Sequence, residues 1–205
     1  MQADRREETE APYPNPHTPA ERRKLSNLGH WLEGGVLGVT AALALLDALK
    51  PDLRWPGRWW PRAAAASGLG LGGWLLAASG HHGGPRLYFR HEHQDRQHLQ
   101  MAALLAAGGA LETSGTGKLA ESGWAAALSG VGALFLAHQQ HGSGDARAEA
   151  ERVHWSLGTR LIATGAAKAA DAARLPGPWR TVWPLLALDV AGRLLRYREP
   201  AGAFE

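Results

Sequence analysis

Two long runs without a charged residue limit the fold more than any other feature of the chain. Residues 63–85 and 123–144 form stretches of 23 and 22 residues that contain no Asp, Glu, Lys or Arg. A helix needs roughly 20 apolar residues to cross the hydrocarbon core of a bilayer. A surface helix of a soluble protein carries a charged stripe instead. Both runs are therefore predicted to be transmembrane helices.

Four weaker segments extend the pattern. Residues 97–111 are apolar after their first few positions, whereas 31–49, 153–173 and 179–195 are long enough to span but carry charges. Small residues recur in these segments, as in GGVLG and AAGGA, and allow close helix packing in lipid. The sequence predicts an all-α, polytopic integral membrane helical bundle with about six transmembrane helices. An Ala-rich soluble helix bundle is the alternative.

Basic residues indicate the orientation in the membrane. Six spans place 13 Lys and Arg residues on one side and seven on the other, and basic loops stay in the cytoplasm. We expect a multi-pass protein of the cell inner (plasma) membrane with both termini cytoplasmic. Residues 1–28 are rich in charge and proline and are predicted to be a mostly unstructured cytoplasmic polar tail. Residues 29–198 form the transmembrane domain, and residues 199–205 form a C-terminal tail.

Tryptophans mark the expected membrane boundaries. Six of them fall near predicted span ends: Trp55, Trp59, Trp60, Trp124, Trp155 and Trp179. Indole rings prefer the headgroup level of a bilayer. The segment RWPGRWWPR is predicted to be an interfacial loop in which proline breaks any helix.

Composition excludes several function classes. The chain has no cysteine, so disulfides, thiolate metal sites, Cys nucleophiles and Cys-linked haem are excluded. The net charge is +3, and no nucleic-acid-binding motif accompanies the basic residues. A soluble enzyme with a Ser nucleophile has no supporting motif, and no catalytic residue is identified. The expected partners are the lipid bilayer and other membrane-protein subunits, without nucleic acid.

Histidine is the residue type that points most directly to chemistry. The predicted topology places all ten histidines at or near one membrane face, and imidazole is the commonest metal ligand. HEHQDRQH and HQQH group several of them, and HWLE places a carboxylate one turn from His30. The candidate metal ligands are His30, Glu33, His91, His93, His98, His138, His141 and His154.

The cofactor expected there is a transition metal (zinc, copper or iron) or haem b. His98, His138 and His154 are the candidates for holding it, because a hairpin of the third and fourth spans brings their helix ends together. The alternative is that these histidines are solvated or hydrogen-bonded to loops, as is expected for His17, His81 and His82.

Charged residues inside the spans form a second group. They are Asp47, Glu112, Arg160, Lys168, Asp171 and Asp189. Intramembrane charges are costly and are functional candidates by default, although structural pairing is an equal alternative. We expect Arg160 to pair with Asp189, and Lys168 with Asp171 at i and i+3. Glu112 is expected toward the side opposite the histidines.

The run QHLQMAALLAAGGALE, followed by FLAHQQHG and a later helix-start histidine, resembles the transmembrane-protein-45-like family of multi-span proteins. The resemblance covers about the middle third of the chain and implies no reaction. It matches His98, Glu112, His138, His141 and His154 to the family pattern by position. The HQQH motif has one more residue than the usual H-x-H of that family, and the stretch from His141 to His154 is longer.

Three functions compete on the sequence. The first is a membrane protein with a histidine-rich metal- or haem-binding site at one face, in redox chemistry or metal handling. The second is an accessory structural subunit of a larger respiratory or photosynthetic membrane complex. The third is a histidine-ligated di-iron membrane oxidase, for which HEHQDRQH and HQQH are incomplete versions of the usual histidine boxes.

Overall fold

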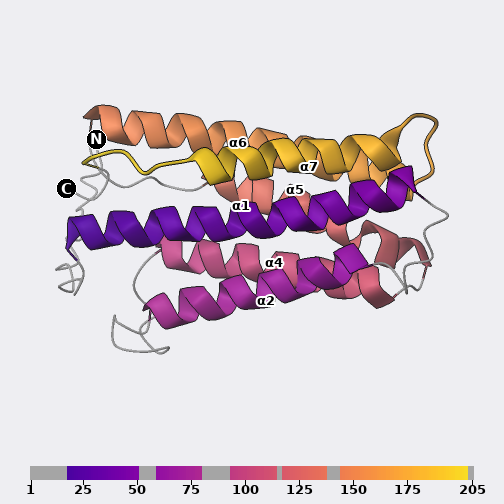
Figure 1. Ribbon diagram of the computed structural model, residues 1–205, viewed down its shortest axis with the longest axis horizontal. Coiled ribbons are helices and arrows are strands. Elements are labelled where there is room, and N and C mark those ends of the chain that lie inside the picture. Colours follow the sequence, from indigo (N-terminus) through magenta and orange to yellow (C-terminus); the bar gives the residue numbers. More distant parts are fainter. Residues whose placement is uncertain (1–17, 51–58, 80–92, 115–116, 138–143, 203–205) are drawn as a thin grey trace, which may run out of the picture.

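Six helices make up the part of the chain that the structure describes. The computed structural model describes residues 18–50, 59–79, 93–114, 117–137 and 144–202. The helices are α1 (Pro19–Leu49), α2 (Trp59–Ser79), α4 (His93–Ser114), α5 (Gly117–Ala137), α6 (Gly144–Ala172) and α7 (Trp179–Arg196). The described residues contain no strand, so the all-α prediction is confirmed (Figure 1).

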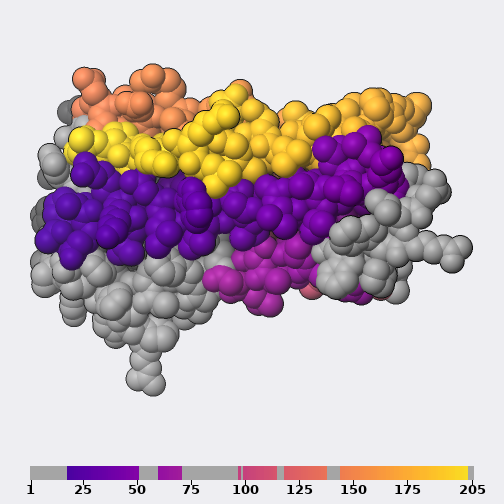
Figure 2. Space-filling model, viewed as in Figure 1, coloured from indigo at the N-terminus to yellow at the C-terminus, as the bar shows by residue number. Residues whose placement is uncertain are grey.

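The helices alternate in direction and close into a circle. α1, α4 and α6 begin at the end of the bundle where α2, α5 and α7 finish (Figure 1). Each helix packs against its neighbours in the chain, and α7 returns to α1, so that these two helices lie side by side along one face (Figure 2). We call the end where α1, α4 and α6 begin the histidine end, after His30 and His154, and the opposite end the Lys168 end.

Two helices begin earlier than the sequence suggested. Thr18 caps α1 through a capping box with Glu21, and proline occupies the first turn, where its missing N–H costs nothing. Residues 19–28 are therefore helical, and the expected unstructured tail is wrong over that range. α6 likewise begins at Gly144 rather than near residue 153. His30 and His154 consequently lie about three turns inside their helices.

Small residues allow the helices to approach closely, as predicted. A Cβ added to Gly68 on α2 would overlap the backbone of Ala106 on α4. Gly132 on α5 and Gly158 on α6 face each other, and a Cβ on either would lie 2.7–2.8 Å from the carbonyl oxygen of the other. Close backbone approach of this kind is typical of helix pairs in membranes.

Two of the tryptophans expected at the membrane boundaries lie near the starts of α2 and α5, but their side chains are buried in the core. Trp60 and Trp124 are 4% and 2% exposed. Their rings lie 6.4 Å apart, and Trp183 lies 5.1 Å from Trp60. Trp59 and Trp60 begin α2 instead of belonging to a loop, because Pro61 is in the first turn, where proline is tolerated.

Apolar side chains are exposed on the outside of the bundle, and several polar side chains are buried inside it. Large apolar side chains are exposed along the middle of several helices, including Val39, Leu69 and Leu185. The interior is mostly apolar but also holds His30, Thr40, Gln97, Glu112, His154, Thr164 and Lys168. By length and composition, the segments Pro19–Leu49 and Lys118–Ala137 could each cross a membrane. The uncharged run 63–85 continues past Ser79, where α2 ends, into residues that the structure does not describe.

Candidate functional site

Two imidazoles from different helices meet inside the bundle at the histidine end. His30 on α1 and His154 on α6 are 8% and 4% exposed, and their ring centroids lie 5.8 Å apart in an edge-to-face arrangement. The two helices run in the same direction (Figure 1), and each histidine is about three turns from its helix start. Because both histidines are equally far from the starts of their helices, their side chains lie at the same height along the bundle axis.

Each imidazole is oriented by its own helix. Nδ1 of His30 lies 2.9 Å from the carbonyl oxygen of Ser26, and Nδ1 of His154 lies 2.8 Å from that of Ala150. A carbonyl oxygen only accepts hydrogen bonds, so Nδ1 must carry the hydrogen in both rings. In the neutral imidazole, Nε2 then has the lone pair that binds a metal ion. Metal-binding histidines usually have this kind of support behind the ligating nitrogen.

Two further aromatic rings enclose the histidine pair. The ring of Tyr197, the residue after α7, lies 4.6 Å from His30 and 5.8 Å from His154 between centroids. Phe135 on α5 lies 5.4 Å from His154. Both enclosing residues are buried. The imidazoles are thus shielded from bulk water by side chains from separate elements.

A carboxylate from the segment after α7 completes these surroundings. Glu199 accepts hydrogen bonds from the hydroxyl groups of Ser26 at 2.7 Å and Tyr197 at 3.3 Å. Its backbone N–H donates to Oδ1 of Asn27 at 2.7 Å. Burial raises the pKa of Glu199, and the two hydroxyl donors offset only part of this effect. Burial also raises the pKa of the Tyr197 hydroxyl, so both groups hold their protons more tightly than in water.

The other predicted histidine ligands are placed only by their elements. α4 begins at His93, and His98 lies in its second turn, so the backbone of both is at the histidine end (Figure 1). α5 ends at Ala137, directly before the HQQH motif. Outside the described residues lie His91, His138 and His141, and the side chains of His93 and His98. Among the described residues, no three His, Asp or Glu side chains are grouped closely enough to share a metal ion.

The charged residues that were expected inside the spans pair differently from the sequence expectation at the Lys168 end. Nζ of Lys168 lies 3.0 Å from Oε1 of Glu112 and 3.9 Å from Oδ2 of Asp171. The side chains of Lys168 and Glu112 are 4% and 0% exposed. Lys168 also donates to the carbonyl oxygen of Glu121 at 3.1 Å. The main partner of Lys168 is therefore Glu112 on α4, not the neighbouring Asp171.

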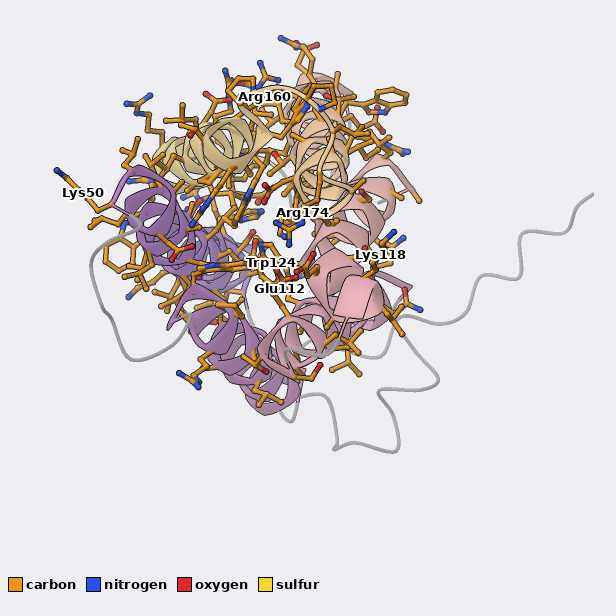
Figure 3. All side chains as sticks on the ribbon, turned by 90° about the vertical axis from the view of Figure 1, so that its right-hand side faces the viewer. Lys50, Glu112, Lys118, Trp124, Arg160 and Arg174 are labelled. Carbon is orange, nitrogen blue, oxygen red and sulfur yellow. The ribbon has the colours of Figure 1, made fainter. Side chains whose placement is uncertain are left out.

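Two tryptophan rings and two more exposed ion pairs surround Lys168. Nζ of Lys168 lies 5.4 Å and 5.8 Å from the ring centroids of Trp60 and Trp183. A small polar cavity of about 110 Å³ adjoins it. Around this cavity, Asp47 pairs with Arg180 at 3.3 Å, and Arg174 pairs with Glu121 at 3.1 Å. Figure 3 looks onto this end and shows Arg174 directed over the interior near Glu112 and Trp124.

The predicted pair between α6 and α7 is confirmed as a contact. Nε of Arg160 lies 3.0 Å from Oδ2 of Asp189, which also accepts from Nε of Arg193 at 3.0 Å. Their side chains are partly exposed, at 37% for Arg160 and 47% for Asp189. The pair therefore lies on the outer surface of the bundle, where Arg160 points outward (Figure 3).

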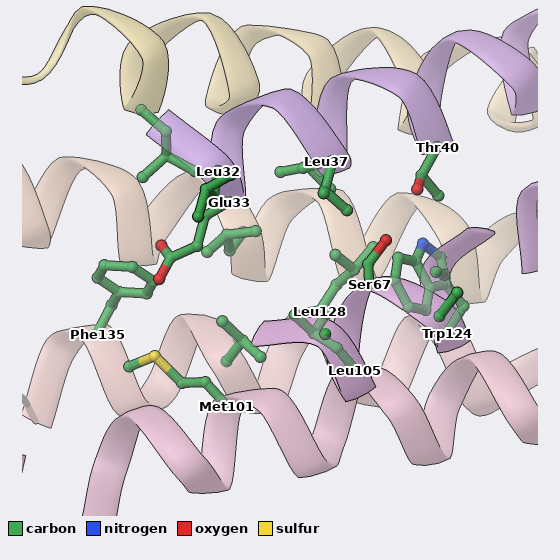
Figure 4. Close-up of a pocket in the computed structure, with 17 residues that line it drawn as sticks. Leu32, Glu33, Leu37, Thr40, Ser67, Met101, Leu105, Trp124, Leu128 and Phe135 are labelled. Carbon is green, nitrogen blue, oxygen red and sulfur yellow. The ribbon is translucent and has the colours of Figure 1, made fainter. Parts of the chain in front are cut away.

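Sequence reasoning missed several residues around these clusters. Tyr197 and Glu199 lie at the expected boundary between domain and tail. Glu199 contacts Asn27 and Ser26 across more than 170 positions, and Tyr197 contacts the distant His30. No local pattern signals such a contact. Glu33, predicted as an additional ligand beside His30, lines a separate apolar cavity (Figure 4), and its role as a ligand stays a prediction.

Comparison of the chain with known protein families, curated proteins and solved structures found no match. The resemblance to the transmembrane-protein-45-like family therefore stays a prediction.

Proposed function

We propose that this chain is a six-span integral membrane protein that binds a transition-metal ion at its histidine end, with His30 and His154 as two of the ligands. The observation that carries the proposal is the contact of these two buried imidazoles across α1 and α6. The bound ion serves metal handling or redox chemistry in the membrane.

The distribution of polarity supports the membrane assignment. Mid-helix residues on the outer face, such as Val39 and Leu69, are exposed and apolar, whereas Glu112 and Lys168 are buried in the interior. In a soluble protein, exposed apolar surface and buried charge are both costly. In a bilayer, charged side chains face the bundle interior and pair with one another. The outer faces of α1 and α2 and the buried Glu112–Lys168 pair match the second environment. The partly exposed Arg160–Asp189 pair on α6 and α7 does not follow this pattern, although its charges neutralise each other.

The ring geometry supports a shared ion. With metal–nitrogen distances of about 2.0–2.1 Å, two imidazoles on one ion have centroids roughly 5–6 Å apart. The separation of 5.8 Å between His30 and His154 falls in that range. The Nδ1 contacts with Ser26 and Ala150 leave Nε2 as the ligating nitrogen of each ring. Further ligands are proposed to come from His98, in the second turn of α4, and from the HQQH motif, which follows the last residue of α5 in the sequence.

A single ion fits the described packing better than haem b. Tyr197 touches both imidazoles, with centroid distances of 4.6 Å and 5.8 Å. Phe135 packs against His154 from another side. A porphyrin between the two imidazoles would have to separate rings whose centroids lie 5.8 Å apart, whereas a single ion would not. An absorption spectrum distinguishes the two cofactors.

Metal analysis of the detergent-purified full chain tests the proposal. After dialysis against zinc, copper or iron salts, we expect one ion per chain and no Soret band. H30Q and H154Q should each lose most of the metal, whereas H82Q should retain it because His82 is expected to be solvated. Occupancy should fall below about pH 6, since protonated imidazole cannot bind a metal. Equal metal content in all four proteins would contradict the site.

Single cysteines test the membrane assignment separately. Ser114 ends α4 at the Lys168 end, and Gly144 begins α6 at the histidine end. The 13-to-7 bias in basic residues predicts that the Lys168 end faces outward. An impermeant thiol reagent should label S114C and not G144C in intact cells. Labelling of both cysteines, or of neither after permeabilisation, would contradict the spanning arrangement.

A further inference from the structure

A large apolar cavity occupies the middle of the bundle, between the histidine end and the Lys168 end. It measures about 500 Å³, and side chains from α1, α2, α4 and α5 form most of its wall (Figure 4). Protein interiors are close-packed and contain few voids larger than a water molecule. Pockets that hold small organic ligands measure roughly 300–1,000 Å³. The cavity has the size of a ligand site.

Two buried polar atoms line this cavity without a partner in the described part of the chain. They are Oγ1 of Thr40 and Nε1 of Trp124, whose residues are 1% and 2% exposed. Buried polar groups are almost always hydrogen-bonded. The indole N–H is a donor only. The missing partner of these two groups is therefore a hydrogen-bond acceptor, such as a carbonyl oxygen.

A carboxyl group lies at the other end of the same cavity. Glu33 is seven residues before Thr40 on α1, so the two side chains share a face and stand about 10 Å apart along the axis. Its carboxyl group points into the cavity beside Phe135 (Figure 4). Within the described residues Glu33 makes no hydrogen bond or ion pair. A carboxylate in apolar surroundings is stabilised by a cation, and the adjacent aromatic face also attracts cations.

We propose that this cavity binds a lipophilic cation: an amine or quaternary ammonium with an apolar body and a hydrogen-bond acceptor at its far end. The ammonium pairs with Glu33, the body fills the apolar middle, and the acceptor receives hydrogen bonds from Thr40 and Trp124. The inference does not rest on the metal site, because neither His30 nor His154 lines the cavity, although Phe135 borders both places.

A permanently charged probe with this layout tests the proposal in the full chain. In (para-benzoylbenzyl)trimethylammonium, a rigid phenylene group separates the cation from the ketone. Its neutral isostere para-neopentylbenzophenone lacks only the charge, and (para-benzylbenzyl)trimethylammonium lacks only the carbonyl oxygen. Affinities are measured by equilibrium dialysis with detergent-solubilised protein. We expect the charged ketone to bind at least about tenfold more tightly than the neutral isostere.

Variants test the Glu33 end and the Thr40–Trp124 end of the cavity separately. E33Q should abolish the preference for the cation, whereas E149Q, which changes the same charge at an exposed position on α6, should keep it. T40V and W124F should each reduce binding of the ketone about fivefold and leave binding of the carbonyl-free cation unchanged. The latter measurement also shows that each variant keeps its fold.

Photocrosslinking through the benzophenone group locates the bound probe. We expect an adduct on the peptide that contains Met101, which lines the cavity, and its loss in E33Q. Equal affinity for the cation and the neutral isostere, unchanged cation preference in E33Q, or adducts confined to outward residues such as Leu69 would each overturn the proposal.

Discussion

Removing one member of the buried pair Glu112–Lys168 should destabilise the fold far more than any surface change. The two side chains are 0% and 4% exposed and 3.0 Å apart. K168M leaves the Glu112 carboxylate without its cation in the interior, and E112Q leaves the ammonium without its anion. Breaking a buried pair in this way costs about 3–5 kcal/mol, whereas replacing both members by apolar groups is often neutral or stabilising.

The assay is thermal unfolding of the detergent-purified protein. For a chain of this length, 1 kcal/mol corresponds to a shift of roughly 2–4 °C, so each single variant should lower Tm by about 6–20 °C. The double variant E112L/K168M should recover most of that loss. D171N is the matched control, because Asp171 is 3.9 Å from Lys168 and more exposed, and it should cost below about 1 kcal/mol. A D171N effect equal to that of E112Q, or strict additivity in the double variant, would refute the reasoning.

Three further predictions address the bundle surface, the packing and the C-terminal segment. In a double-mutant cycle of R160M and D189N, the changes in the free energy of unfolding should be non-additive by about 0.5–1 kcal/mol. D189N should be the more destabilising, because the Asp189 carboxylate accepts hydrogen bonds from two arginines. Additive changes would exclude coupling. G68A should lower Tm, since the new Cβ would overlap the α4 backbone. G70A is the control, because the space around Gly70 is open. Equal Tm values for the two variants would show that the close contact is absent. Because burial raises the pKa of Glu199 above its ordinary value of 4.5, the stability linked to this carboxyl is fully present below that value and is lost as pH rises through the folded pKa. E199Q should therefore flatten the fall in Tm as pH rises above 4.5, and an unchanged slope would contradict the assignment.

The helices were predictable because the sequence features that specify them lie within each helix. Uncharged runs and recurring small residues indicate where a helix lies and how closely it packs. The error at the start of α1 arose because polar sequence was equated with disorder, although Thr18 and Glu21 provide a capping box that begins a helix there. Helix starts therefore depend on capping chemistry as well as on hydropathy.

The clusters inside the bundle were less predictable because they depend on helix packing. Glu112 and Lys168 meet through the position of α4 relative to α6, which no spacing in the sequence specifies. Tyr197 reaches the two histidines only because α7 closes the circle beside α1. His30 and His154 were identified as candidates from residue type and expected topology. Their mutual contact, and the apolar cavity beside Glu33, are properties of packing.

X-ray absorption spectroscopy of the metal-loaded protein reports the ligands of the bound ion itself. We expect at least two imidazole nitrogens at about 2.0–2.1 Å, with one imidazole lost from the spectrum in H30Q and one in H154Q. A coordination shell composed only of oxygen atoms, or spectra identical among the wild type and both variants, would contradict metal binding by this histidine pair.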